Sequence, residues 1–300
     1  MKQSFLWAFG LTLILGAMSA LCQAPPVHAA QTPAPISSTK GEVPAPPEPE
    51  RWDWSESVLP GQGIRVENPF GDVRARFGGY EGKVEIHAVL QNLHAGAAPL
   101  KVLTDFGPAG LTIRVGRPAG AEPPAGDGPK DHVDLVVRIP KGSPLTLRTI
   151  SGTIEANGLQ GDVSAESERG SISVRDVRGL VSTVNRYGVT ELVLEAPPPG
   201  SEQTFESLTG DISVTLPARA DATVVAQTSA WITTDISLDI VRHPREEPSK
   251  TATGKVGNGT ARLLFKTKRG SIQIFQMDDV SQLEIAPHTQ KTKPPGSDDD

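Results

Sequence analysis

Four acidic residues in the middle of the sequence are the best candidates for acid–base chemistry: Glu155, Glu166, Glu168 and Asp176. Two carboxyl groups placed across a glycosidic bond can hydrolyse it, so a β-helical polysaccharide-active enzyme is one interpretation. Arginines are interleaved with these acids, as expected on the polar outer face of a strand. No acid, base and substrate-positioning group converge in the sequence. We therefore predict no catalytic residues and treat the enzyme as the less favoured alternative.

The sequence has no convincing motif for binding a metal or a cofactor. The sequence contains no P-loop, no dinucleotide-binding fingerprint and no GxSxG elbow. Asp162, Asp176 and Asp211 occupy differing places in the repeats, unlike the aspartates of calcium-binding nonapeptide repeats, and we interpret them as turn formers. We predict neither a metal nor a cofactor. No two of the six histidines have metal-ligand spacing: His28, His87, His94, His132, His243 and His288.

The composition narrows the class of protein. The 300 residues include 27 prolines and 30 glycines, which disfavours long helices. The net charge of -6 provides no basic footprint for nucleic acid or for an anionic membrane, so we predict no nucleic-acid partner.

The N-terminal segment, residues 1–30, has the features of a signal peptide. Lys2 precedes an apolar run from Phe5 to Leu21, and small residues follow near Ala29 and Ala30, where we expect cleavage. An uncleaved membrane anchor and a lipidated Cys22 are the two alternatives. Leu21 stands before Cys22 where lipoprotein signals have a small residue. We predict export to the periplasm, cell surface or medium, with membrane contact only through this segment.

The rest of the chain divides by composition. Residues 31–51 contain six prolines in their first twenty positions and predict an extended linker, while residues 287–300 end in three aspartates and predict a disordered acidic tail. Between them, residues 52–286 show apolar residues at every second position, which is typical of half-buried strands. Residues 117–130, 196–202 and 242–250 break this pattern and predict exposed loops.

A repeat of eighteen residues organises the centre of this domain. Ile154 matches Ile172 and Val163 matches Val181 when residues 151–168 are aligned with 169–186, so each unit holds two short strands and two turns. One unit cannot close a core, whereas stacked units would bury the isoleucines in one inward row and the valines in the facing row. The fold predicted is all-β, a β-helix or β-roll-like solenoid with no substantial helix apart from the signal peptide. Glycines recur every nine residues at the corners: Gly152, Gly161, Gly170, Gly179 and Gly188.

Three tryptophans raise the question of exposed aromatic surface. Trp52 and Trp54 are two residues apart and would project from one strand face. They could cover the open end of the stack, or they could form a binding platform for a sugar ring. Trp231 lies beside Ile232 in an apolar run, and we predict that it is packed.

Five phrases in order resemble the bacterial putative-adhesin domain family, whose members are exported repeat proteins of unassigned activity. The resemblance covers roughly residues 63–285 and implies a β-solenoid, export and a role in adhesion or envelope interactions. It implies no catalytic residues. The phrases are Asn68 to Val73, Val136 to Gly142, the repeats themselves, Val214 to Pro217, and Val256 to Gly259 followed by a strand pair ending in Gly270 to Ile272.

These observations predict an exported, non-enzymatic, adhesin-like binding or structural protein. Its partner would be a cell-surface glycan or an envelope protein, recognised by flat strand faces and the three loops. The alternative is a sensory or structural component of the envelope that binds a membrane protein.

Overall fold

The computed structural model describes residues 48–79, 82–93, 97–121 and 130–277. The predicted signal peptide, most of the linker, Cys22, His28, His94, His288 and the predicted tail lie outside these residues. All of the described part belongs to one compact unit, residues 45–300. Its regular structure consists of strands, which confirms the all-β prediction, and none of its segments is a helix long and apolar enough to cross a membrane.

The strands of the described residues form two mixed sheets, neither of which closes on itself. The first, sheet A, runs in the order β1 (Glu50–Ser57), β4 (Lys83–Gln91), β7 (His132–Ile139), β3 (Val73–Phe77), β9 (Ile154–Asn157), β11 (Ile172–Val177), β13 (Thr190–Leu194), β15 (Ile212–Leu216), β21 (Ile272–Gln276), β17 (Ile232–Thr234). The second, sheet B, runs in the order β18 (Asp239–Arg242), β19 (Lys250–Val256), β16 (Ala222–Thr228), β20 (Ala261–Thr267), β14 (Glu202–Ser207), β12 (Val181–Asn185), β10 (Val163–Ser167), β8 (Leu145–Thr149), β2 (Gly63–Asn68), β6 (Gly110–Gly116), β5 (Lys101–Gly107).

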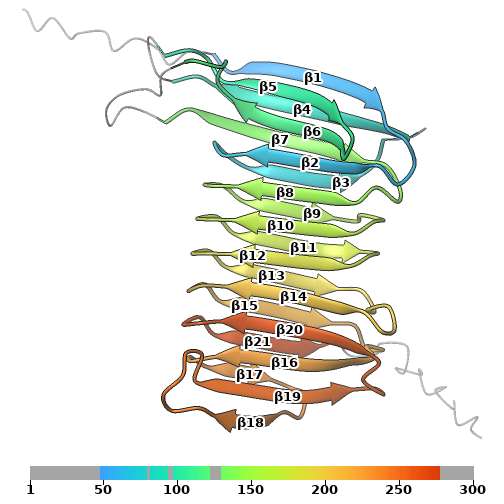
Figure 1. Cartoon of the computed structure of the whole chain (residues 1–300), viewed down its shortest axis with the longest axis vertical. Coiled ribbons are helices and arrows are strands. Elements are labelled where there is room, and N and C mark those ends of the chain that lie inside the picture. Colours follow the sequence, from blue (N-terminus) through green and yellow to red (C-terminus); the bar gives the residue numbers. More distant parts are fainter. Residues whose placement is uncertain (1–47, 80–81, 94–96, 122–129, 278–300) are drawn as a thin grey trace, which may run out of the picture. The chain divides into compact units, whose positions relative to one another are not determined.

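Consecutive strands of the central region alternate between the two sheets. From β8 to β15 each strand lies in the sheet opposite its predecessor, and its neighbours within a sheet are parallel to it (Figure 1). Ile154 is the register partner of Ile172, and Val163 is the register partner of Val181. The eighteen-residue spacing in the sequence is therefore the distance along the chain from one strand to its parallel neighbour.

The core lies between the sheets and is built by alternation along each strand. In β11, Ile172 and Val174 are fully buried while Ser173 between them is half-buried on the outer face. Successive side chains of a strand point to opposite faces, so every second residue enters the core. Two aromatic side chains, Phe205 and Phe265, are fully buried in it and stack with centroids 5.0 Å apart.

Antiparallel pairs occur at both ends of sheet B and at one end of sheet A, whose other edge strand, β17, pairs parallel with β21. At one end β1 pairs antiparallel with β4, and β5 pairs antiparallel with β6; at the other end β18 pairs antiparallel with β19. Strand β1 begins at Glu50, so the folded chain includes two residues that the composition assigned to the linker. The pairing of β1 with β4 over eight residues explains this difference, because the strand partner rather than local composition decides where β1 begins.

The prediction that Trp231 is packed is wrong, since 78% of its side chain is exposed. Ile232 is the register partner of Ile272 and takes the inward position, so the preceding residue must point outward. The Lys250 ammonium lies 5.6 Å from the centre of the Trp231 ring. The alternation of side chains along the strand therefore exposes Trp231 although its ring is apolar.

Candidate binding surface

The repeat glycines form columns at the corners of the stack. Gly170 lies against Gly152, and Gly188 lies against Gly170, so closely that a Cβ on the later glycine would collide with the carbonyl oxygen of the earlier one. Gly179 stands in the same relation to Gly161 at the opposite corner. The nine-residue spacing thus alternates between two corners. The first column comprises Gly71, Gly152, Gly170, Gly188, Gly210 and Gly270.

A buried polar residue stands three positions before each glycine of the first column, a feature that the sequence reasoning missed. Asn185 is the clearest case: its amide Nδ2 donates to the carbonyl oxygen of Gly170 at 3.0 Å, and its Oδ1 accepts from the N–H of Gly188 at 3.2 Å. The pattern Asn/Ser/Thr-x-x-Gly is visible in the sequence and could have been found there. The residues are Asn68, Thr149, Ser167, Asn185, Ser207 and Thr267.

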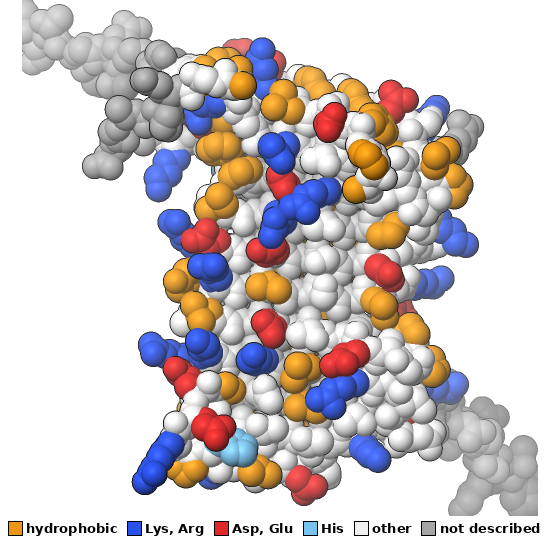
Figure 2. Space-filling view, viewed as in Figure 1, with side chains coloured by type: hydrophobic (Ala, Val, Ile, Leu, Met, Phe, Trp, Pro, Cys, Tyr) orange, Lys and Arg blue, Asp and Glu red, His pale blue; other side chains and the backbone are white. Residues whose placement is uncertain are grey.

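The two residues between each buried polar side chain and its glycine form an outward-facing edge, which we call the corner rim. Successive corners are joined by main-chain hydrogen bonds, such as that from the Tyr187 N–H to the Glu168 carbonyl oxygen at 3.1 Å. Figure 2 shows Lys and Arg side chains along this edge of the molecule, at the left. The rim consists of Pro69, Phe70, Ile150, Ser151, Glu168, Arg169, Arg186, Tyr187, Leu208, Thr209, Lys268 and Arg269.

Next to the corner rim, a row of charges crosses the outer face of sheet B. Glu67 lies 2.8 Å from Arg114, Glu166 lies 2.6 Å from the Arg148 Nε, and Glu206 lies 3.7 Å from Lys266. One apolar residue, Val184, interrupts the alternation with 46% of its side chain exposed. In register order the row reads Arg114, Glu67, Arg148, Glu166, Val184, Glu206 and Lys266.

Glu67 is the most strongly held carboxylate of this row. Burial acts to raise the pKa of Glu67, but hydrogen bonds from Arg65 and Arg114 outweigh it and hold the pKa below the usual 4.5. The Arg65 Nε lies 2.6 Å from the carboxylate. Glu67 is therefore an ionised member of the row at neutral pH and is fully occupied by its two arginines.

Two hollows lie between the charge row and the corner rim, and they share Val184 and Arg186. Their volumes are about 350 Å³ and about 370 Å³. Because they share lining residues, the two hollows adjoin one another across the strands of sheet B, and we call them together the rim groove. Its principal side chains are Arg148, Ile150, Glu166, Glu168, Val184, Arg186, Leu208, Lys266 and Lys268.

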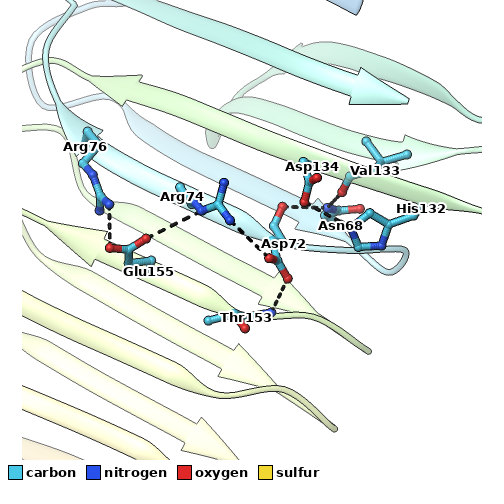
Figure 3. Close-up of polar contacts among 9 residues, drawn as sticks. All are labelled: Asn68, Asp72, Arg74, Arg76, His132, Val133, Asp134, Thr153 and Glu155. Atoms are coloured by element: carbon cyan, nitrogen blue, oxygen red, sulfur yellow. Dashed lines mark hydrogen bonds and ion pairs between the residues drawn. The ribbon is translucent and has the colours of Figure 1, made fainter. Parts of the chain in front are cut away.

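The outer face of sheet A carries a second polar network, drawn in Figure 3. Glu155 lies 2.5 Å from the Arg76 Nη2 and 3.7 Å from the Arg74 Nε. Asp72 lies 3.5 Å from Arg74 and accepts a hydrogen bond from the Thr153 N–H at 2.8 Å. These ion pairs link neighbouring strands, and the carboxylates that the network contains are engaged by arginines.

The four acids considered for catalysis are not brought together as one group, although Glu166 and Glu168 both line the rim groove. Glu155 lies on β9 in sheet A, while Glu166 lies on β10 in sheet B. Glu168 is 3.8 Å from Arg169 on the corner rim, and Asp176 lies in a bulge of β11 with a φ of 53°. Sheet A and sheet B face away from each other on their outer sides, so these carboxylates cannot flank one glycosidic bond as a group.

The turn aspartates and the histidines have structural contacts of their own. The Asp162 carboxylate accepts the Leu180 N–H at 2.8 Å, and the Asp211 carboxylate accepts the Ser271 N–H at 2.6 Å, so each links one corner to the next. His87 lies on β4 with its Nδ1 2.7 Å from Asp53, and His132 begins β7 with its Nε2 3.1 Å from Asp134. Across the described ranges, no three His, Cys, Asp or Glu side chains are grouped to hold a metal.

Trp52 and Trp54 lie on β1 and project from one face of that edge strand. Their rings are stacked, with centroids 6.4 Å apart and an interplanar angle of 8°, and Trp54 also lies 6.5 Å from Phe106 of β5. Both tryptophans are half-buried against the core. They therefore join the edge strands of the two sheets, and a sugar-binding role for them stays a prediction.

The loop predicted at residues 117–130 is anchored by a buried ion pair at its base. Arg117 binds Asp131, donates to the Ala98 carbonyl oxygen at 3.0 Å and lies 5.6 Å from the Phe70 ring centre. The Asp131 carboxylate also accepts the Leu93 N–H at 2.6 Å. Arg117 thus belongs to the scaffold rather than to an exposed loop.

Comparison with known proteins gives neighbours only at the level of structure. No family model matches the chain, and no curated protein matches it. A putative cell adhesion protein from Clostridium sporogenes is 9% identical and covers 77% of this chain and 100% of its own, with a TM-score of 0.40. A putative adhesin from Bacteroides fragilis is 12% identical and covers 76% of this chain and 97% of its own, with a TM-score of 0.25.

A third neighbour is a putative lipid binding protein from Parabacteroides distasonis, 8% identical, covering 77% of this chain and 97% of its own, with a TM-score of 0.25. The names of the first two agree with the resemblance predicted from the sequence. At these identities and TM-scores the likenesses carry no argument about a ligand.

Proposed function

We propose that the protein is an exported, non-enzymatic binding protein whose two sheets act as a solenoid-like scaffold for an extended recognition surface. The domain would comprise residues 52–286 with the two preceding residues of β1, held by the linker and preceded by a cleaved signal peptide. The repeat glycines and the inward aliphatic rows supply the scaffold. The outer face of sheet B, with the corner rim, supplies the surface.

The observation that carries this proposal is the charge row with its adjoining rim groove. Side chains from seven neighbouring strands stand in register along one line, which suits many weak polar contacts with an extended ligand. The carboxylates of the row are ion-paired rather than poised for proton transfer. Such a surface suits binding better than turnover.

The proposal is tested by incubating the full-length protein with immobilised neutral and acidic polysaccharides and with intact bacterial envelopes. We expect retention on at least one polysaccharide, without release of sugar or of unsaturated products. Release of sugar would contradict the non-enzymatic assignment. Retention on no glycan, together with stoichiometric capture of one envelope protein, would replace it with the sensory or structural alternative.

The contribution of the predicted loop at residues 117–130 to binding is measured with a variant that leaves the scaffold intact. Replacing residues 118–130 with a glycine–serine linker keeps Arg117 and its ion pair with Asp131, whereas removing residue 117 as well would break that buried ion pair. The variant that keeps Arg117 should have an unchanged unfolding temperature, so that any change in its binding is due to the missing loop.

A further inference from the structure

The rim groove is lined by equal numbers of acidic and basic side chains, but two of its cations have no acidic partner within the described part of the chain. Each carboxylate that lines the groove has a basic partner. The pairs are Glu67 with Arg65 and Arg114, Glu166 with Arg148, Glu168 with Arg169, and Glu206 with Lys266. Arg186 and Lys268 are exposed and make no ion pair with any residue that the structure describes. These two cations are available to a ligand.

Arg186 and Lys268 lie on one line along the stack. The Thr209 N–H donates to the Arg186 carbonyl oxygen and the Lys268 N–H donates to the Leu208 carbonyl oxygen, so Leu208 stands on the corner between them. Adjacent strands lie about 4.8 Å apart, which places the two backbone positions about 10 Å apart. The two cations therefore stand two strands apart, with the apolar side chain of Leu208 on the corner between them.

Apolar and aromatic side chains stand among the ion-paired groups around these cations. Val184, on the floor of the rim groove, is 46% exposed, and Tyr187, next to Arg186 on the corner rim, is 55% exposed. An exposed tyrosine ring offers a flat face with a polar tip, which is the form of surface on which a sugar ring stacks. The groove thus combines free cations with places for the apolar faces of sugars.

We infer that the rim groove binds a linear acidic polysaccharide that lies across the strands, with a carboxylate on every second sugar. The carboxylates would pair with Arg186 and Lys268, while the intervening sugar rests over Leu208. An extended chain of pyranose rings advances by close to one strand spacing per sugar, so alternate sugars meet alternate corners. This inference names the ligand for the binding surface and rests on the proposed function.

Other anionic partners fit this groove less well. A nucleic acid carries a phosphate on every nucleotide and therefore requires a denser row of cations. A single strand also needs successive aromatic side chains on which its bases stack. The aromatic residues of the described corner rim are Tyr187 and the half-buried Phe70. A bilayer is flat and would not enter a depression behind a charge row. An extended acidic peptide binds best along a free strand edge, but this groove crosses strands that are already paired on both sides.

The test uses the full chain and a hyaluronan hexasaccharide as the probe, because its carboxylates occur on alternate sugars. The double variant Arg186→Gln with Lys268→Gln should weaken its binding at least tenfold in calorimetry at low salt. The matched control is Lys141→Gln with Arg178→Gln, two exposed cations at the opposite corners with the same change in net charge. The control should weaken binding less than twofold.

The remaining probes decide between outcomes. A neutral chitin hexasaccharide should bind at least tenfold more weakly than the hyaluronan probe. Equal losses in both double variants would overturn the site, since the effect would then come from overall charge. Tighter binding of a thymidine decanucleotide or of phosphatidylserine vesicles would overturn the ligand class. If polysaccharides bind and the Arg186/Lys268 variant binds them unchanged, the inference fails while the proposed function stands.

Discussion

Gly170 rests directly on the carbonyl group of Gly152, with no room for a Cβ between the two corners. Gly170→Ala would force the corners apart, because the obstructing atoms are backbone and cannot rotate away. We expect a loss of about 2 kcal/mol or more in the free energy of unfolding, measured by urea denaturation. Gly107→Ala is the control, since a Cβ there meets nothing within 4 Å and the residue lacks a positive φ. A loss as large at Gly107 would contradict the stacking explanation.

Asn185 and Ser207 occupy equivalent corners, but we expect their replacement by alanine to affect stability differently. Asn185→Ala removes a buried amide that satisfies the Gly170 carbonyl oxygen and the Gly188 N–H, and should cost about 2 kcal/mol. Ser207→Ala removes a buried hydroxyl that has no hydrogen-bond partner among the described residues, and should be neutral or slightly stabilising. Thermal unfolding of both variants checks the pair, and equal destabilisation would show that the corner amide has no special role.

Arg117 should be far more important for stability than arginines on the sheet face. Arg117→Met removes the buried ion pair with Asp131, and we expect a loss of about 3 kcal/mol. Arg114→Met removes an exposed partner of Glu67 and should cost less than about 1 kcal/mol. Chemical denaturation of the two variants measures the contrast. Faster proteolysis between residues 117 and 131 in Arg117→Met would show that the base of the loop has opened.

Val184 interrupts the charge row between two carboxylates. Val184→Arg would place a cation next to both Glu166 and Glu206, and we expect stabilisation of about 0.5 kcal/mol that diminishes at high salt. Ser182→Arg, on the same strand face but opposite Ser164, is the control and should show no such gain. An equal, salt-independent gain in both variants would mean that packing rather than charge is responsible.

The pH dependence of stability should contain a contribution from Glu67. Its pKa is lower in the folded chain than the usual 4.5, so its stabilisation is fully present above that value and is lost as the pH falls through the folded pKa. Glu67→Gln should therefore cost about 1 kcal/mol at pH 7 and much less at pH 3. Urea denaturation at the two pH values measures this difference. A cost that does not change with pH would assign the effect to packing.

Much of the strand pattern could be predicted from local order. Ile172 and Val181 are inward because alternation of apolar residues dictates it, and the recurrence of glycine marks where two corners touch. The buried Asn185 could also have been anticipated, since the same three-residue offset from glycine occurs at six corners. Trp231 could not, because its exposure depends on the parity inherited from the pairing of Ile232 with Ile272.

The rim groove could not be predicted from the sequence, for a different reason. Net charge is a sum over the whole chain, and the value of -6 argues against an anionic partner. Arg186 and Lys268 are 82 positions apart in the chain and come to lie two corners apart only because β20 inserts beside β14. The pairing of distant strands, rather than composition, brings the two unpaired cations close together.

Residue order on its own establishes that the chain is built from strands, that its centre repeats every eighteen residues and that glycine is required at the corners, because these features depend on neighbours along the chain. Which carboxylates are neutralised, which cations stay free and which tryptophan is exposed depend on contacts between remote segments. Those contacts exist only once the two sheets have formed, since their geometry is set by strand pairing across the stack.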